Sequence, residues 1–299
     1  MRSLSPDVVI AFEEPFGLFA LQSVAAARHC VPAAPIVLYS WDNMSGGVSY
    51  PYRPKTLYRL IERWVMPRIS VLLTANKEAY DRFAAMYTTP ISLVYFGIDM
   101  KGFGDQRKPD RDQPKDPARF CVGYLGRLLP MKGVDTLVDA LPLLPSHVHV
   151  SIVGNGPDLP RLKERVRNQR GENRIAFQRA VNSERVKDIL STFDVLVLPS
   201  RTTPRWKEQY GRVLIEAMAS GVPVIGSDSG AIPEVIGDAG LIYPEGDARA
   251  LAHSIRQFLS DDGLRDRLSR AGMRRAQRFS AVTFAEEMYR LLGGLARAQ

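Results

Sequence analysis

Residues 120–157 decide the fold and read FCVGYLGRLLPMKGVDTLVDALPLLPSHVHVSIVGNGP. Apolar runs cover Phe120 to Leu125 and Val148 to Val153, and a glycine turn and a helical pattern separate them. Apart from His149 and Ser151 both runs are apolar, which is typical of strands in a parallel sheet that is covered on both faces. The stretch therefore predicts two parallel strands joined by a helix.

The same alternation continues through the second half of the chain. Four further short apolar runs cover Ile175 to Phe177, Val195 to Leu198, Pro223 to Gly226 and Gly240 to Ile242. Strands that alternate with helical patterns in this way predict a doubly wound α/β domain of the Rossmann-like type. We place this domain at residues 118–279.

The first hundred residues show the same alternation with fewer strands. The expected strands cover Val8 to Ala11, Ile36 to Tyr39, Val71 to Thr74 and Ile91 to Val94. We therefore expect a partial Rossmann-like domain over residues 1–100. Residues 101–117 are rich in Gly, Pro and charged residues, which predicts an exposed linker. At 299 residues the chain is long enough for two domains of ordinary size.

Composition narrows the classes of protein. Apolar residues make up 45% of the chain and charged residues 24%, which are ordinary values for a globular protein. Cys30, Cys121 and the four histidines show no metal-ligand spacing, and the DRD string at residues 110–112 lies among prolines, so we predict no disulfide and no metal site. No apolar run approaches the roughly 18 residues of a membrane span. We expect a cytoplasmic protein.

The net charge of +8 is compatible with nucleic acid, an anionic membrane surface or a phosphorylated ligand as partner. The densest basic cluster consists of Arg270, Arg274, Arg275 and Arg278. It lies on a polar helical pattern, so we interpret it as a solvated face. Peripheral contact with an anionic membrane surface is the alternative, and we expect no nucleic acid as partner.

Candidate binding residues follow the expected strands of the second domain. In a doubly wound sheet, ligands bind beyond the carboxyl ends of the strands. Gly126, Arg127 and Lys132 follow the first strand, Gly156 follows the second, and Val181 follows the third. A glycine in such a turn lets the backbone approach a ligand closely, and the two cations suit an anionic ligand.

After the fourth strand comes SRTTPRWKEQYGRVLIEAMASGVPVI, residues 200–225. We expect a helix to begin near Gln209, so that the amides of Gln209, Tyr210 and Gly211 favour an anion or sugar oxygens. Glu208 and Glu216 would then lie about 12 Å apart along the helix axis. That distance is about the reach from a ribose to a hexose across a diphosphate.

The segments GRLLPMKG, VGNGP, EQYGRVLIEAMASGVPVI and SGAIPE, in this order, resemble the retaining GT-B glycosyltransferases of family 4 over about residues 90–290. The resemblance implies two Rossmann-like doubly wound domains that face each other across a cleft, with the first one incomplete and joined by a C-terminal helix at residues 280–299. It assigns the donor diphosphate to Arg127 and Lys132, the hydroxyls of the transferred sugar to Glu208, the ribose hydroxyls to Glu216, and the base to the backbone of Val181.

By the same resemblance, the chain is a hexosyltransferase-type enzyme that transfers a sugar from a nucleotide-diphosphate-sugar to an unknown acceptor with retention of anomeric configuration. The leaving phosphate takes the proton of the acceptor, so neither a metal nor another cofactor is expected. UDP and GDP are both open as the nucleotide. The acceptor is a glycan, a lipid-linked molecule or a small molecule, and polysaccharide biosynthesis is the expected setting.

The first domain departs from the family pattern. Relatives commonly carry a His after the strand that corresponds to Ile36 to Tyr39, where this chain has Ser40 to Asn43. Glu13 stands where some relatives have His. We expect Glu13 or Asp42 either to contact sugar or acceptor or to make a structural hydrogen bond.

Nothing before Pro6 resembles the first strand and glycine-rich acceptor loop of the family, so we expect an N-terminally shortened chain or a divergent member with a reduced acceptor domain. This short front motivates a second class of function, a catalytically inactive nucleotide-sugar-binding remnant or assembly subunit. A nicotinamide-dependent oxidoreductase shares the fold, but the first turn of the second domain lacks G-x-G-x-x-G.

Overall fold

The computed structural model describes residues 5–44, 55–103 and 119–297. The chain divides into two compact units. The first unit comprises Met1–Gly97, Pro204–Tyr210 and Ser280–Gln299, and the second comprises Ile98–Thr203 and Gly211–Phe279. Most of the linker expected at residues 101–117, with the DRD string at 110–112, lies outside the described residues.

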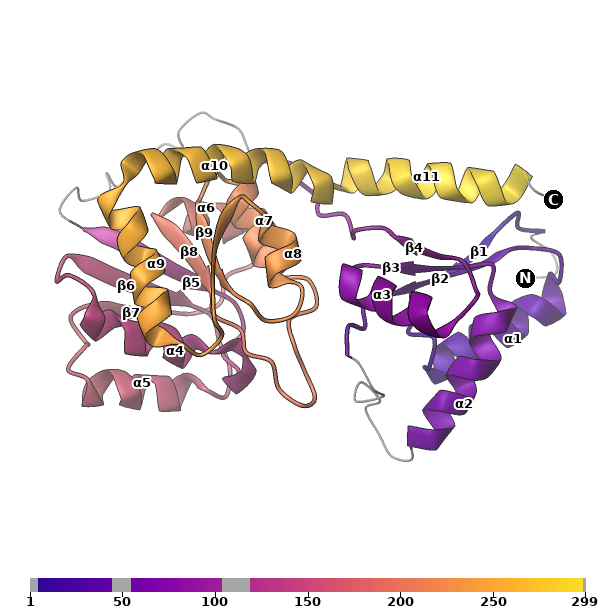
Figure 1. The fold of residues 1–299 in the computed structure, drawn as a ribbon, viewed down its shortest axis with the longest axis horizontal. Helices are drawn as coiled ribbons and strands as arrows, with labels where there is room; N and C mark the ends of the chain where they lie inside the picture. Colours follow the sequence, from indigo (N-terminus) through magenta and orange to yellow (C-terminus); the bar gives the residue numbers. More distant parts are fainter. Residues whose placement is uncertain (1–4, 45–54, 104–118, 298–299) are drawn as a thin grey trace. The chain divides into compact units, whose positions relative to one another are not determined.

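The first unit contains a four-stranded parallel sheet in the order β1-β2-β3-β4 (Figure 1). Its strands are β1 (Val9–Ala11), β2 (Ile36–Ser40), β3 (Val71–Thr74) and β4 (Ile91–Leu93). The expected strands are thereby confirmed, with ends that differ by at most one residue.

Helices cover both faces of this sheet. They are α1 (Leu18–Cys30), α2 (Lys55–Val65), α3 (Lys77–Met86) and α11 (Ala281–Arg297). Leu38 of β2 packs in one core with Phe83 of α3, whereas Tyr39 packs in a second core with Met288 of α11. Successive side chains of a strand point to opposite faces, and because both faces are covered, all five residues of β2 are buried.

The second unit contains a six-stranded parallel sheet in the order β10-β9-β8-β5-β6-β7. Its strands are β5 (Phe120–Leu125), β6 (Val148–Val153), β7 (Ile175–Gln178), β8 (Val195–Leu198), β9 (Val224–Ser227) and β10 (Gly240–Tyr243). All six expected strands are confirmed. The chain builds outward from β5 to β7 and then returns to the other side of β5 with β8, so the switch point of this doubly wound sheet lies between β5 and β8.

Helices and short turns connect these strands. The helices are α4 (Val134–Ala140), α5 (Leu159–Asn168), α6 (Val186–Ser191), α7 (Arg212–Ala219), α8 (Ile232–Ile236), α9 (Ala248–Ser260) and α10 (Asp262–Ala276). The expected start of a helix near Gln209 is wrong, because α7 begins only at Arg212. Gly211 precedes it with a φ of 68°, a left-handed conformation that interrupts helical backbone. Glu208 therefore lies in a loop, and the 12 Å spacing along one helix does not apply.

Candidate functional site

The loops that follow β5 and β6 lie backbone against backbone. The Gly126 N–H donates to the carbonyl of Val153 (3.0 Å), and the Leu128 N–H donates to the carbonyl of Asn155 (2.9 Å). A Cβ atom at Gly156 would lie 2.0 Å from the carbonyl oxygen of Leu128. The close approach that Gly156 permits is thus between two loops of the protein, a role that the sequence did not reveal.

The loop after β5 presents two cations at the carboxyl edge of the second sheet. The hydroxyl of Tyr124 donates to the carbonyl of Arg127 (2.8 Å), and the Arg127 side chain is exposed. Lys132 ends a 3-10 turn and is half-buried. Gly133 follows with a φ of 64°, and a Cβ atom there would lie 2.0 Å from the carbonyl oxygen of Pro199. This turn brings the start of α4 directly against the chain that leaves β8.

Helix α7 begins at the same edge without a side-chain cap. Its N-cap residue is Gly211, and no side chain accepts a hydrogen bond from the first amides of the helix. Such amides, together with the helix dipole, favour an anion. Glu216 lies about one turn further on, and its carboxylate accepts a hydrogen bond from Arg212 Nε (2.7 Å). Burial raises the pKa of Glu216, and the charge and hydrogen bond of Arg212 oppose this rise.

Residues 204–210 group with the first unit. Asn43 Nδ2 donates to the carbonyl of Glu208 (2.8 Å), and Asn76 Nδ2 donates to the carbonyl of Gln209 (3.2 Å). Glu208 is only 7% exposed. Glu208 and Gln209 are therefore held by amide side chains of the first unit.

Two further expected donor residues lie in different units. The hydroxyl of Tyr210 donates to the carbonyl of Phe96, within the first unit. Val181 is half-buried in the loop after β7, within the second unit. Their assignments to the donor stay predictions.

Asp42 lies in a buried ion-pair chain at the carboxyl edge of the first sheet. Its Oδ2 lies 2.5 Å from Arg82 Nη1, and Arg82 Nη2 lies 3.6 Å from Glu62 Oε2. Glu62 also accepts a hydrogen bond from the hydroxyl of Tyr87 (2.9 Å). Asp42 thus makes a structural contact, and its contact with sugar or acceptor stays a prediction.

A second carboxyl group at this edge belongs to Glu14, the neighbour of the expected Glu13. Glu14 accepts hydrogen bonds from the hydroxyl of Ser40 and from the N–H of Trp41 (2.9 Å). Burial raises the pKa of Glu14 to about 7, the charge of Asp42 adds to the rise, and the hydrogen bonds oppose it. The sequence FEEP contains both glutamates and gives no signal that tells which one turns inward.

The basic cluster near the C-terminus is not wholly a solvated face. Arg275 Nε donates to the carbonyl of Val235 (2.6 Å), and its Nη2 donates to the carbonyl of Glu234. Arg275 therefore binds the carbonyl end of α8, where a cation is favoured by the helix dipole. For this residue the expectation of a solvated side chain is wrong.

The described residues contain neither a cluster of metal-ligating side chains nor a helix that could span a membrane. No three His, Cys, Asp or Glu side chains in those ranges gather in a way that suits a metal ion. The same ranges contain no helix that combines the length and the apolar character of a membrane span.

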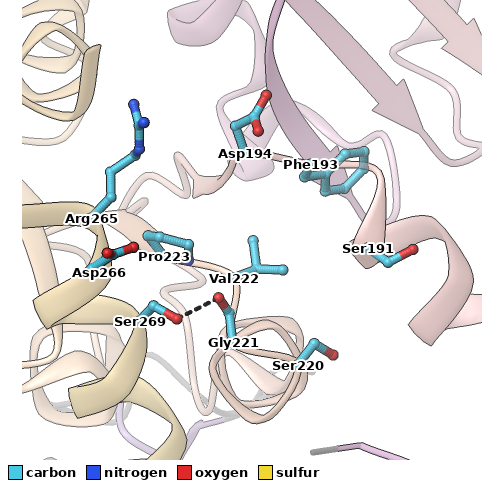
Figure 2. Close-up of a pocket in the computed structure, with 10 residues that line it drawn as sticks. All are labelled: Ser191, Phe193, Asp194, Ser220, Gly221, Val222, Pro223, Arg265, Asp266 and Ser269. Carbon is cyan, nitrogen blue, oxygen red and sulfur yellow. Dashed lines mark hydrogen bonds between the residues drawn. The ribbon is translucent and has the colours of Figure 1, made fainter. Parts of the chain in front are cut away.

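A hollow of about 230 Å³ lies at the opposite edge of the second sheet (Figure 2). Asp194 and Pro223, which line it, immediately precede β8 and β9, so the hollow is at the amino ends of these strands. Asp194 Oδ2 accepts a hydrogen bond from the Cys121 N–H (2.7 Å), and the Ser269 hydroxyl donates to the carbonyl of Gly221 (2.7 Å). These polar groups hold the protein's own backbone, and none of the expected donor residues lines the hollow.

The two parallel-sheet α/β units match the GT-B fold of solved glycosyltransferase structures. The structure of Anabaena HepE in complex with UDP matches with a TM-score of 0.83 and 20% identity, covering 98% of this chain and 80% of that chain. Sucrose-phosphate synthase from Thermosynechococcus elongatus matches with a TM-score of 0.74 and 24% identity, covering 93% and 78%. At such identities these similarities establish the fold alone.

Sequence similarity gives the family. Residues 105–275 match the family described as Glycosyl transferases group 1, and the chain belongs to this family. The D-inositol 3-phosphate glycosyltransferase of Jonesia denitrificans is 28% identical over 260 residues, which cover 79% of this chain and 59% of that protein. A GDP-mannose-dependent alpha-(1-6)-phosphatidylinositol monomannoside mannosyltransferase of Mycobacterium tuberculosis is 31% identical over 262 residues, with 82% and 66% covered. The chain spans less than two thirds of the length of these curated relatives.

Proposed function

We propose that the chain transfers a sugar from a nucleotide-diphosphate-sugar to an acceptor hydroxyl with retention of anomeric configuration. The observation that carries the proposal is the switch point of the second sheet, where the cationic loop after β5 and the open start of α7 share one edge. Family membership supports it, as do relatives whose names specify glycosyl transfer and GDP-mannose. UDP is the nucleotide bound in HepE, so we keep both UDP and GDP as candidates.

We assign the donor to the carboxyl edge of the second sheet. Arg127 and Lys132 bind the diphosphate, because both are cations on the loop that follows the central strand β5. Glu216 binds the ribose hydroxyls, since a carboxylate accepts hydrogen bonds from two neighbouring hydroxyls. Glu208 binds hydroxyls of the transferred sugar, and the backbone of Val181 binds the base.

The proposed reaction exchanges one bond at the anomeric carbon for another. The bond between this carbon and the phosphate oxygen breaks, and a bond to the acceptor oxygen forms on the same face of the sugar. The proton of the acceptor hydroxyl goes to the departing phosphate oxygen. Arg127, Lys132 and the amides of α7 stabilise the negative charge that accumulates on the diphosphate.

We further propose that transfer needs no metal ion and no cofactor other than the donor. The two cations of the loop after β5 supply positive charge at the place where a divalent ion would otherwise neutralise the diphosphate. Turnover should therefore be unchanged in EDTA. Loss of turnover in EDTA that returns when Mg²⁺ is added would contradict this part of the proposal.

Thermal unfolding with a panel of UDP-sugars and GDP-sugars tests the donor. A ligand that binds only the native state stabilises it by RT ln(1 + [L]/Kd), so the correct donor should raise Tm in a concentration-dependent way. NMR of the first product formed should show the anomeric configuration of the donor, and an inverted centre would contradict retention. Binding without hydrolysis or transfer would instead indicate the inactive nucleotide-sugar-binding subunit.

A surface of the first unit supports peripheral contact with an anionic membrane. On α2, Leu57 and Leu60 are 46% and 62% exposed, and Arg59 and Arg63 are exposed between and beyond them. The acidic residue of this helix, Glu62, is 1% exposed and faces the core. Exposed leucines flanked by arginines are typical of helices that lie on an anionic bilayer.

Sedimentation with lipid vesicles tests this contact. The chain should sediment with vesicles of phosphatidylcholine and phosphatidylglycerol and not with vesicles of phosphatidylcholine alone. Leu60→Glu and Arg63→Glu should each reduce the bound fraction, whereas Arg270→Glu, an exposed charge reversal on α10, should not. Equal losses in all three variants would attribute binding to net charge and not to α2.

A further inference from the structure

Residues 200–202, in the loop that follows β8, connect several loops of the second unit. The carbonyl of Ser200 accepts a hydrogen bond from the Ser227 hydroxyl at the end of β9 (2.5 Å). The Thr202 N–H donates to Glu245 Oε2 in the loop after β10 (2.7 Å). This short segment therefore joins the carboxyl ends of β8, β9 and β10.

Arg201 extends these connections across the switch point. Its main-chain N–H donates to the carbonyl of Met131 (2.8 Å), in the turn that contains Lys132. Its Nη1 and Nη2 lie 3.2 and 3.1 Å from the two carboxylate oxygens of Asp135, and Nη2 donates to the hydroxyl of Thr136 (2.7 Å). Asp135 lies in the first turn of α4 and its side chain is 8% exposed. One arginine thus ties the loop after β8 to the cationic turn after β5.

Asp135 has a second arginine partner that does not cross the switch point. Arg161 of α5 binds Asp135 Oδ2 (3.2 Å) and Asp158 Oδ1 (2.6 Å). Its side chain is 46% exposed, against 33% for that of Arg201. The two arginines therefore share one carboxylate, but only Arg201 joins the two sides of the switch point.

The hydrogen bonds of the Arg201 side chain are not complete. Its Nε is buried and, among the described residues, has no hydrogen-bond partner. Burial of a donor without an acceptor costs free energy. The planar fork of the guanidinium reaches Asp135 and Thr136 together, which a lysine ammonium on a flexible stem does not reproduce.

We infer that Arg201 is a positioning residue of the donor site. It holds the turn that contains Lys132 in a fixed position relative to the loop after β8. The inference rests on the proposed function, because it concerns the placement of the diphosphate-binding cation. A shift of about 1 Å in a positioned group is enough to reduce turnover by up to about 10²-fold. Arg201 acts through Lys132 and need not touch the donor itself.

The test compares Arg201→Met with Arg161→Met, because each removes one of the two arginines that bind Asp135 among the described residues. Donor affinity, kcat and KM for donor hydrolysis, and Tm are measured for both variants and for the wild type. We expect Arg201→Met to lower kcat/KM for the donor by about tenfold or more and Arg161→Met to change it less than about twofold, at similar losses of Tm. Arg201→Lys should recover Tm more than kcat/KM.

The outcomes separate this inference from the proposed function. If the wild type binds no nucleotide sugar, the proposed function fails and the inference falls with it. If the wild type binds and turns over a donor but Arg201→Met and Arg161→Met affect kcat/KM equally, only the inference is overturned. If Arg201→Met does not fold, the comparison is made with Arg201→Lys, and a kcat/KM equal to that of the wild type would overturn the inference.

Discussion

The carboxyl edges of the two sheets differ in how their charges are used. In the first unit, the charged groups at this edge pair with each other, because Arg82 lies between Asp42 and Glu62 and all three side chains are at most 9% exposed. In the second unit, the loop after β5 leaves Arg127 exposed and the start of α7 has no side-chain cap. Charges that are buried against each other are satisfied within the fold, whereas the exposed Arg127 and the uncapped amides of α7 suit an anionic ligand.

The largest expected effect is the loss of either cation at the second edge. Arg127→Ala and Lys132→Ala should each reduce turnover of the donor by about 10²-fold or more, because prearranged charge at a leaving group stabilises the transition state. Donor hydrolysis measures this without knowledge of the acceptor. Arg267→Ala, an exposed cation of α10, is the matched control. Turnover near the wild-type value in both site variants would mean that they are surface cations.

The next largest effect is expected at Gly156, where the loops after β5 and β6 pack closely at the carboxyl edge of the second sheet. A methyl group at position 156 would meet the carbonyl oxygen of Leu128 at 2.0 Å, so Gly156→Ala should destabilise the fold by about 1–3 kcal/mol and weaken nucleotide binding. Gly294→Ala is the control, because beyond the neighbouring residues and the backbone of its own helix nothing lies within 4 Å of a Cβ atom there, and alanine favours a helix. Urea unfolding with and without nucleotide measures both changes. Equal stability of the two variants would contradict the packing at Gly156.

Substitution of Glu208 and substitution of Glu216 should impair different properties of the enzyme. Glu216→Gln should weaken free nucleotide and nucleotide sugar alike, because we assign its carboxylate to the ribose. Glu208→Gln should mainly lower kcat and leave the affinity for free nucleotide unchanged, because we assign it to the transferred sugar. Calorimetric titration with UDP and GDP, together with donor hydrolysis, separates the roles. Equal losses of free-nucleotide affinity would show that these roles are assigned wrongly.

The last prediction concerns Glu14 at the edge of the first sheet, where we expect a pH dependence of stability and no direct effect on the donor. Its pKa is raised from 4.5 to about 7, so the folded state favours the protonated form. The contribution of protonated Glu14 to the stability of the folded state is complete below pH 4.5 and is lost as pH rises to about 7. The free energy of unfolding of the wild type should therefore fall relative to that of Glu14→Gln across this range.

Urea titrations followed by tryptophan fluorescence at several pH values measure this difference. The fluorescence reports on the first unit, because Trp41 lies next to Glu14. Glu13→Gln is the control and should follow the wild type. Parallel curves for the wild type and Glu14→Gln would contradict the raised pKa.

The strands could be predicted from the sequence almost to the residue, because each contains a short run of mostly apolar residues. The few polar residues inside them, such as His149 and Ser151 of β6, do not interrupt this pattern. The start of α7 could not be predicted, since a single left-handed glycine at position 211 overrides the helical pattern before it. The role of Arg201 could not be predicted either. Its role depends on Asp135, which is 66 residues away, and no local pattern marks such a pair.

The most direct test of the donor site is hydrogen exchange of backbone amides with and without UDP or GDP. The start of α7, the turn after β5 and the loop after β6 have the amides that we assign to the donor edge. We expect nucleotide to slow exchange at residues 126–133 and 211–216 of the second unit and to leave residues 36–44 of the first unit unchanged. Protection confined to residues 36–44, or no protection at saturating nucleotide, would contradict a donor site at the switch point of the second sheet.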